Sequence, residues 1–127
     1  MNKKALFVDD EQDVLEIYEA LCVQAGYEAH ISATASEALQ TIKRENIQVM
    51  FFDLKMPDMN GIELCRKVRE KNKIALIYAV TGYSSLFQLA ECREAGFDDY
   101  FKKPIDFELF TNILKQSFQK LERWSKR

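Results

Sequence analysis

The sequence predicts an α/β fold in which five parallel strands alternate with five helices. Short apolar segments of strand length alternate along the chain with longer segments whose apolar residues recur every three or four positions. Two of the short segments, residues 49–52 and 74–80, are apolar at every position, which is typical of parallel strands buried on both faces. Strict alternation of strand and helix implies a parallel sheet covered by helices on both sides, with right-handed connections.

The chain opens with a strand, a helix and a second strand. Residues 4–8 form an apolar segment that ends at the acidic pair Asp9-Asp10. A helical pattern then continues to Gly26, a residue that suits the end of a helix. Residues 27–31 alternate between apolar and polar side chains, as expected for an edge strand.

The middle of the chain holds the second helix, the third strand and the third helix. Thr34 and Glu37 form a capping box that begins the second helix. Residues 49–53 form the third strand, which runs directly into a carboxylate. Asn60 can cap the third helix, and Asn72 is a suitable place for it to end.

The remaining elements follow the same rules. The fourth strand is expected over residues 74–80, and a helix should run from a capping box at Ser85 to Gly96. A short fifth strand covers residues 99–101, and the last helix extends over about residues 106–124. The polar second strand and the short fifth strand suit the edges. The expected topology is therefore a doubly wound, flavodoxin-like (βα)5 sheet with strand order 2-1-3-4-5.

Composition excludes several classes of protein. A chain of 127 residues, 47% hydrophobic and 30% charged, has the size and composition of one globular domain. The net charge of -2 argues against direct binding of nucleic acid. No apolar run is long enough to cross a membrane, and the first residues lack the features of a signal peptide, so we expect a cytoplasmic protein. The three cysteines are expected to be buried, reduced side chains: Cys22, Cys65 and Cys92.

Three carboxylates should meet at one edge of the sheet. Asp9, Asp10 and Asp53 all end their strands at the same edge, and strands one and three are neighbours in the expected order. A hard divalent cation such as Mg²⁺ or the ammonium of Lys103 could neutralise them. Thr81 ends the fourth strand at this edge and could donate a hydrogen bond to an anion. These groups suit phosphoryl transfer onto a carboxylate.

At this point the sequence resembles the receiver domain of response regulators in two-component signalling, of the chemotaxis-Y-like type. The matching residues, in chain order, are Asp9-Asp10, the stretch 53–61, Thr81-Gly82, Tyr100 and Lys103-Pro104. The resemblance covers residues from about 3 to about 121. We therefore expect a receiver domain over residues 1–121, followed by a basic helix end or linker over residues 122–127.

The resemblance implies a role for each matching residue. Asp53 would accept the phosphoryl group, while Asp9, Asp10, Asp53 and the backbone carbonyl of Lys55 would hold Mg²⁺. Thr81 and Lys103 would bind the phosphoryl oxygens, Tyr100 would be the switch aromatic, and the Lys103-Pro104 bond would be cis. Lys55 and Tyr83 flank the site and are expected to set the lifetime of the phosphate.

The partners follow from the same resemblance. The donor would be a sensor histidine kinase or a histidine phosphotransfer protein, because His30, the only histidine, is expected far from the acids. The output surface would comprise the fourth helix, the fifth strand and the fifth helix. In the last helix we expect the early apolar residues, among them Phe107, to be core. Leu121 and Trp124 lie beyond what a compact domain needs; they could cover its bottom, pair two copies as a homodimer, or begin a coiled-coil linker.

Three other functions compete with this one. A phosphatase of the haloacid-dehalogenase type needs an aspartate two residues after the nucleophile, where this chain has Lys55. A flavodoxin needs a phosphate-binding loop after the first strand, where Asp9-Asp10-Glu11 would repel phosphate. A receiver-like scaffold that works without phosphate stays open. We do not expect an enzyme that turns over a small molecule.

Overall fold

The computed structural model describes residues 3–82 and 85–126. Five strands and five helices alternate along these segments, as predicted. The elements in chain order are β1 (Lys4–Val8), α1 (Gln12–Gln24), β2 (Glu28–Ser32), α2 (Ala35–Arg44), β3 (Val49–Asp53), α3 (Gly61–Lys71), β4 (Leu76–Thr81), α4 (Leu86–Ala95), β5 (Asp99–Lys102) and α5 (Phe107–Ser125).

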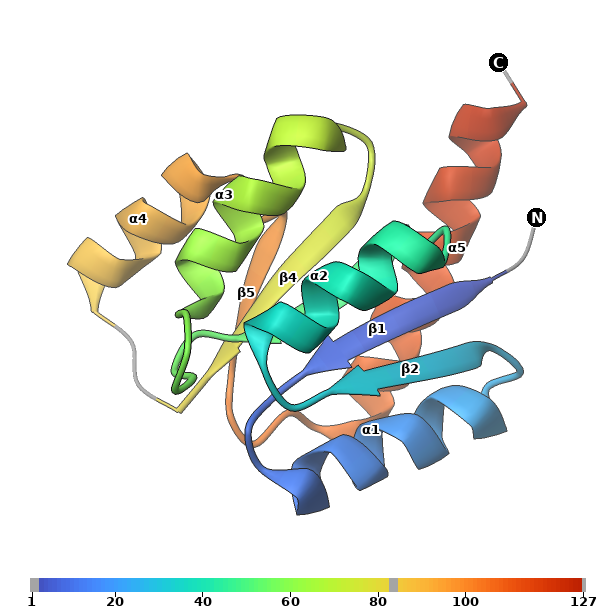
Figure 1. The fold of residues 1–127 in the computed structure, drawn as a ribbon. Coiled ribbons are helices and arrows are strands. Elements are labelled where there is room, and N and C mark those ends of the chain that lie inside the picture. Colours follow the sequence, from blue (N-terminus) through green and yellow to red (C-terminus); the bar gives the residue numbers. More distant parts are fainter. Residues whose placement is uncertain (1–2, 83–84, 127) are drawn as a thin grey trace.

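The five strands form one parallel sheet in the order β2-β1-β3-β4-β5. This confirms the predicted topology. Helices α1 and α5 cover one face, and α2, α3 and α4 cover the other (Figure 1). Val8 pairs with Phe52, so the carboxyl ends of β1 and β3 lie side by side at the same edge of the sheet.

Four helices begin at the capping residues that the sequence predicted. In each, the side chain of the capping residue accepts a hydrogen bond from the backbone N–H three residues later. This N–H lies in the first turn, where the helix itself offers no acceptor. The capping residues are Thr34, Asn60, Ser85 and Asp106, with distances of 3.1, 2.8, 3.1 and 3.0 Å.

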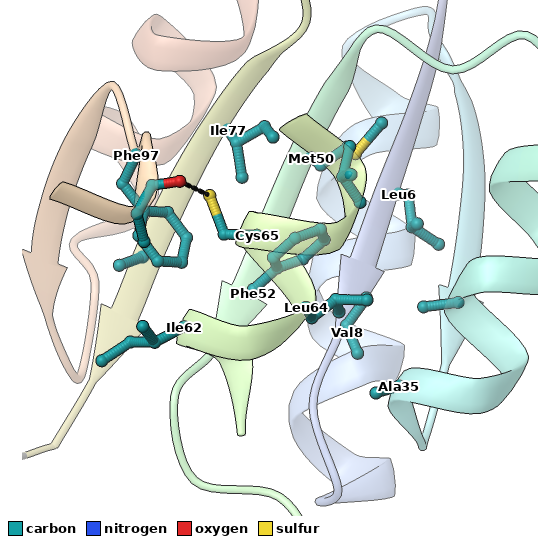
Figure 2. Close-up of a cluster of buried hydrophobic side chains, with 14 of the residues drawn as sticks. Leu6, Val8, Ala35, Met50, Phe52, Ile62, Leu64, Cys65, Ile77 and Phe97 are labelled. Carbon is teal, nitrogen blue, oxygen red and sulfur yellow. Dashed lines mark hydrogen bonds between the residues drawn. The ribbon is translucent and has the colours of Figure 1, made fainter. Parts of the chain in front are cut away.

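A separate hydrophobic cluster fills each side of the sheet. The cluster under α2, α3 and α4 includes Phe52, Leu64 and Phe97 (Figure 2). Cys65 lies within it and donates a hydrogen bond from Sγ to the carbonyl oxygen of Ala95 at 3.5 Å. The opposite cluster joins the sheet to α1 and α5. All three cysteines are buried and free, as predicted.

The start of the fourth strand was predicted two residues too early. The strand runs from Leu76 to Thr81, and the side chain of Ile74 is 56% exposed. The cause is Asn72, whose Oδ1 accepts hydrogen bonds from the N–H groups of Ile74 and Ala75 at 3.1 and 2.9 Å. These two N–H groups are bonded to the turn and are not available to pair with a neighbouring strand, so the strand begins after them.

The apolar face of α5 is shifted relative to the prediction. Phe107, expected in the core, is 59% exposed, whereas Leu121 is only 4% exposed, in keeping with the alternative that it covers the bottom of the domain. The buried face starts at Phe110 and continues to Leu121, so the first turn of the helix stands outside the core. Trp124, one turn further on, is exposed.

The last turns of α5 continue without a break past residue 121 to Ser125. An ion pair between Lys3 and Glu122, at 2.8 Å, links this part of the helix to the beginning of the chain. Within the described segments, every helix is too short or too polar to span a lipid bilayer.

Candidate functional site

The structure brings the three predicted carboxylates together at the edge where β1 and β3 end. Asp9 follows β1 and Asp53 is the last residue of β3. Oxygen atoms of Asp9, Asp10 and Asp53 lie within 4.8 Å of one another. Asp9 and Asp53 are only 1% and 6% exposed, whereas Asp10 is open to solvent. Two buried carboxylates side by side disfavour each other's ionisation, so a nearby cation is needed to keep both of them charged.

Lys103 supplies a positive charge to this cluster from the loop after β5. Its Nζ donates a hydrogen bond to Asp9 Oδ2 at 2.7 Å and lies 3.4 Å from Asp53 Oδ2. The backbone N–H of Lys103 donates to the carbonyl oxygen of Thr81 at 2.7 Å, which connects the loop to the end of β4. The Lys103-Pro104 bond is cis, as predicted.

Burial and charge shift the pKa values of Asp53 and Lys103. Burial, followed by the charge of Asp9, raises the pKa of Asp53, and Lys103 offsets only part of that effect. Burial alone would lower the pKa of Lys103, but the bond to Asp9 and the charges of Asp53 and Asp9 outweigh it and raise the pKa. Lys103 is therefore a permanent cation in the site at neutral pH.

Backbone groups hold the two buried carboxylates in place. The N–H of Glu11 donates to Asp9 Oδ1 at 2.9 Å, and the N–H of Lys55 donates to Asp53 Oδ1 at 3.3 Å. Each carboxylate thus has one oxygen bonded to the backbone and the other facing Lys103. The side chain of Lys55 is exposed at the rim of the site.

Gly61 allows the chain after Asp53 to fold back on the end of β3. A Cβ atom at this position would collide with the carbonyl oxygen of Asp53 and lie 3.1 Å from Leu54 Cα. The N–H of Gly61 donates to the carbonyl oxygen of Leu54 at 3.0 Å, closing the loop over residues 54–60. The sequence marked this glycine only as part of a turn, because the close approach depends on the tertiary path of the chain.

Thr81 ends β4, the strand next to β3, and Tyr100 lies one strand further on, in β5. Thr81 is buried at the carboxyl end of β4, where it pairs with Lys102 of β5. Tyr100 is half-buried against the hydrophobic cluster under α2, α3 and α4, and its hydroxyl donates a hydrogen bond to Gln88 Oε1 at 3.5 Å. Tyr83, expected to flank the site, lies outside the described residues.

His30 is far from this edge of the sheet, as predicted. Its Nε2 lies 2.6 Å from Glu28 Oε2 and 4.0 Å from Glu45 Oε1, in an edge-strand cluster near the beginning of β1. The ammonium of Lys4 lies 3.0 Å from Glu45 Oε1 and balances the charge of that carboxylate.

The donor set at the end of β1 and β3 fits a divalent metal ion. Three carboxylates face one ammonium, which leaves the cluster with a formal charge of about -2 when all three are ionised. Carboxylate oxygens are the ligands that Mg²⁺ prefers, and Mg²⁺ commonly binds where a few carboxylates meet a phosphate. Asp10 keeps the cluster open to solvent, so an ion has access to it.

Comparison with known proteins assigns the family. The family model of the response regulator receiver domain matches residues 5–115. The chain belongs to the response regulator receiver domain family. This confirms the resemblance inferred from the sequence and places the chain among the signalling domains of two-component systems.

Individual relatives agree with this assignment. Sporulation initiation phosphotransferase F of Bacillus subtilis is 27% identical over 116 residues, which are 91% of this chain and 94% of that protein. Alkaline phosphatase synthesis transcriptional regulatory protein PhoP of the same organism is 31% identical over 104 residues, 82% of this chain. The matched part is only 43% of PhoP.

The solved structures match the whole fold. The structure of a CheY-like receiver domain protein from Methanospirillum hungatei JF-1 superposes with a TM-score of 0.87 at 34% sequence identity. The match covers 99% of this chain and 98% of that one. The receiver fold therefore accounts for nearly every residue of this chain.

Proposed function

We propose that this receiver domain accepts a phosphoryl group on Asp53 in the presence of Mg²⁺. The observation that carries the proposal is the convergence of three carboxylates with Lys103, whose Nζ lies 2.7 Å from Asp9 and 3.4 Å from Asp53. The name of one relative, a sporulation phosphotransferase, supports the same chemistry. The domain covers residues 1–121, and residues 122–127 form a basic helix end or linker.

Each group has a defined part in the transfer. A carboxylate oxygen of Asp53 attacks the phosphorus of a donor phosphohistidine, so that a P–O bond forms as the P–N bond breaks. Lys103 and the hydroxyl of Thr81 bind the phosphoryl oxygens. Asp9, Asp10, Asp53 and the carbonyl of Lys55 would hold the metal ion. When bound, Mg²⁺ neutralises negative charge on the carboxylates and the phosphoryl group.

The donor and the target are other proteins. The donor is a sensor histidine kinase or a histidine phosphotransfer protein, because the chain's only histidine, His30, lies in a salt-bridged cluster away from Asp53. The output surface comprises α4, β5 and α5. Phosphorylation of Asp53 changes this surface through Thr81, Lys103 and the switch residue Tyr100. This surface binds an effector or a second copy of the domain, and the protein acts in the cytoplasm.

The direct test is intact mass after incubation with acetyl phosphate, with and without Mg²⁺. We expect wild type to gain one phosphoryl group only when Mg²⁺ is present, and Asp53→Asn to gain none because the amide is not a nucleophile. A folded wild-type protein that gains no mass would contradict the proposal and favour a scaffold that works without phosphate.

A further inference from the structure

The first turn of α2 receives a cap from outside the helix. The carboxylate of Asp58, in the loop over residues 54–60, accepts hydrogen bonds from the N–H groups of Ala35 and Ser36 at 3.2 and 3.1 Å. Thr34 satisfies the next donor, the N–H of Glu37. Asp58 thus takes the two backbone donors that the helix's own cap leaves unpaired.

This contact fixes the middle of the loop that follows Asp53. The two ends of the loop are fixed by Asp53 Oδ1, which accepts from the N–H of Lys55, and by the bond from Gly61 to Leu54. Between them, the carboxylate of Asp58 links the loop to α2 through its two hydrogen bonds. Loss of water contact alone would raise the pKa of Asp58, but the N–H groups of Ser36 and Ala35 lower it, so the tether is charged at neutral pH.

We propose that Asp58 is a positioning residue for the metal site. By holding residues 54–60 on the amino end of α2, it keeps the carbonyl of Lys55 directed toward the carboxylate cluster. Groups that orient metal ligands commonly contribute 10- to 100-fold to metal affinity, about the range expected here. This inference rests on the proposed function, because it concerns the metal that phosphoryl transfer requires.

The test is the Mg²⁺ dissociation constant, measured by titration of the ¹⁵N-labelled protein followed by NMR. We expect Asp58→Ala to raise the dissociation constant about 10-fold. Asp58→Asn retains one acceptor oxygen and should have an intermediate effect. At saturating Mg²⁺, the rate of phosphorylation of Asp58→Ala by acetyl phosphate should return to within about threefold of wild type, because the reacting groups are unchanged.

Two control variants separate the tether from other effects of the substitution. Thr34→Ala removes a cap from the same helix turn without touching the loop. Glu37→Gln removes one negative charge from the same end of α2. Both should bind Mg²⁺ within about twofold of wild type, since the side chains of Thr34 and Glu37 accept their hydrogen bonds from the N–H groups of Glu37 and Ala33 and not from the loop.

The outcomes distinguish this inference from the proposed function. If wild type binds Mg²⁺ and Asp58→Ala binds it equally well, the positioning role is wrong and the proposed function stands. The same conclusion follows if either control weakens binding as much as Asp58→Ala does. If wild type neither binds Mg²⁺ nor accepts a phosphoryl group, both the proposed function and the positioning role of Asp58 are wrong.

Discussion

Asp53 occupies an unfavourable position for a charged side chain. It is almost fully buried and lies beside the buried carboxylate of Asp9, with Lys103 as the only cation bonded to the pair in the described part of the chain. Its raised pKa shows that the folded protein favours the protonated acid more than the unfolded chain does. The residue that suits phosphoryl transfer therefore reduces the stability of the metal-free fold.

This predicts that Asp53→Asn stabilises the metal-free protein at pH 7. Because the native pKa is raised, the contribution of Asp53 to stability is greatest when the acid is protonated and is lost as pH rises through the native pKa. The variant should gain about 1 kcal/mol at pH 7. The gain should shrink as pH falls toward the ordinary pKa of 3.8. Urea unfolding between pH 4.5 and 7.5, without divalent ions, measures it.

Asp10→Asn is the matched control, because it removes the same charge from the exposed member of the cluster. We expect a smaller change in the free energy of unfolding for this variant. A less stable Asp53→Asn protein at pH 7 would show that the ion pair with Lys103 outweighs burial.

At the scale of elements, the connection from β3 to α3 is the most constrained segment near the site. It must return against the end of β3 within a few residues, and Gly61 makes that return possible because it has no side chain. The apolar segments and capping residues predict where β3 ends and α3 begins. They do not predict how closely the two elements approach.

Gly61→Ala should therefore destabilise the fold by about 2–3 kcal/mol, because the added methyl group would collide with the backbone of Asp53 and Leu54. Gly82→Ala is the control at the same edge of the sheet, since no described atom lies within 4 Å of a Cβ built there. It should change stability by less than about 0.5 kcal/mol. Thermal and urea unfolding of both variants measure the difference, and equal effects would contradict the steric argument.

At the scale of the whole molecule, one sheet separates two hydrophobic clusters that each contain cysteine. Cys22, a residue of α1, lies in the cluster between the sheet and the helices α1 and α5, and Cys65 and Cys92 lie on the opposite side. Burial raises the pKa of Cys22 and of Cys65 to about 12, so very little reactive thiolate is present at neutral pH. The thiols therefore report on the integrity of both sides of the sheet.

We predict that all three thiols react with 5,5′-dithiobis(2-nitrobenzoic acid) at least about 100-fold more slowly in native protein than in urea, because reaction requires opening of a cluster. Mass spectrometry of partly labelled protein identifies each site. A native cysteine that reacts at the rate of the unfolded chain would show that its side of the sheet opens independently.

The sequence by itself determined the fold class, the strand order and the meeting of the acids. These depend on local patterns and one topological rule. Apolar segments set the strands, capping residues set the helices, and parallel strands place their carboxyl ends at one edge. Asp9, Asp53 and Lys103 could therefore be predicted to converge although they are far apart in the chain.

Only the tertiary structure decided which side chains are covered and which loops are tethered. The burial of Leu121 and the exposure of Phe107 depend on where α5 lies along the sheet, which helical periodicity does not specify. The two hydrogen bonds between Asp58 and α2 connect it with Ala35, 23 positions away in the chain, and with Ser36, 22 positions away. Such contacts carry no local signature, because the acceptor and its donors become neighbours only after the sheet and helices have packed.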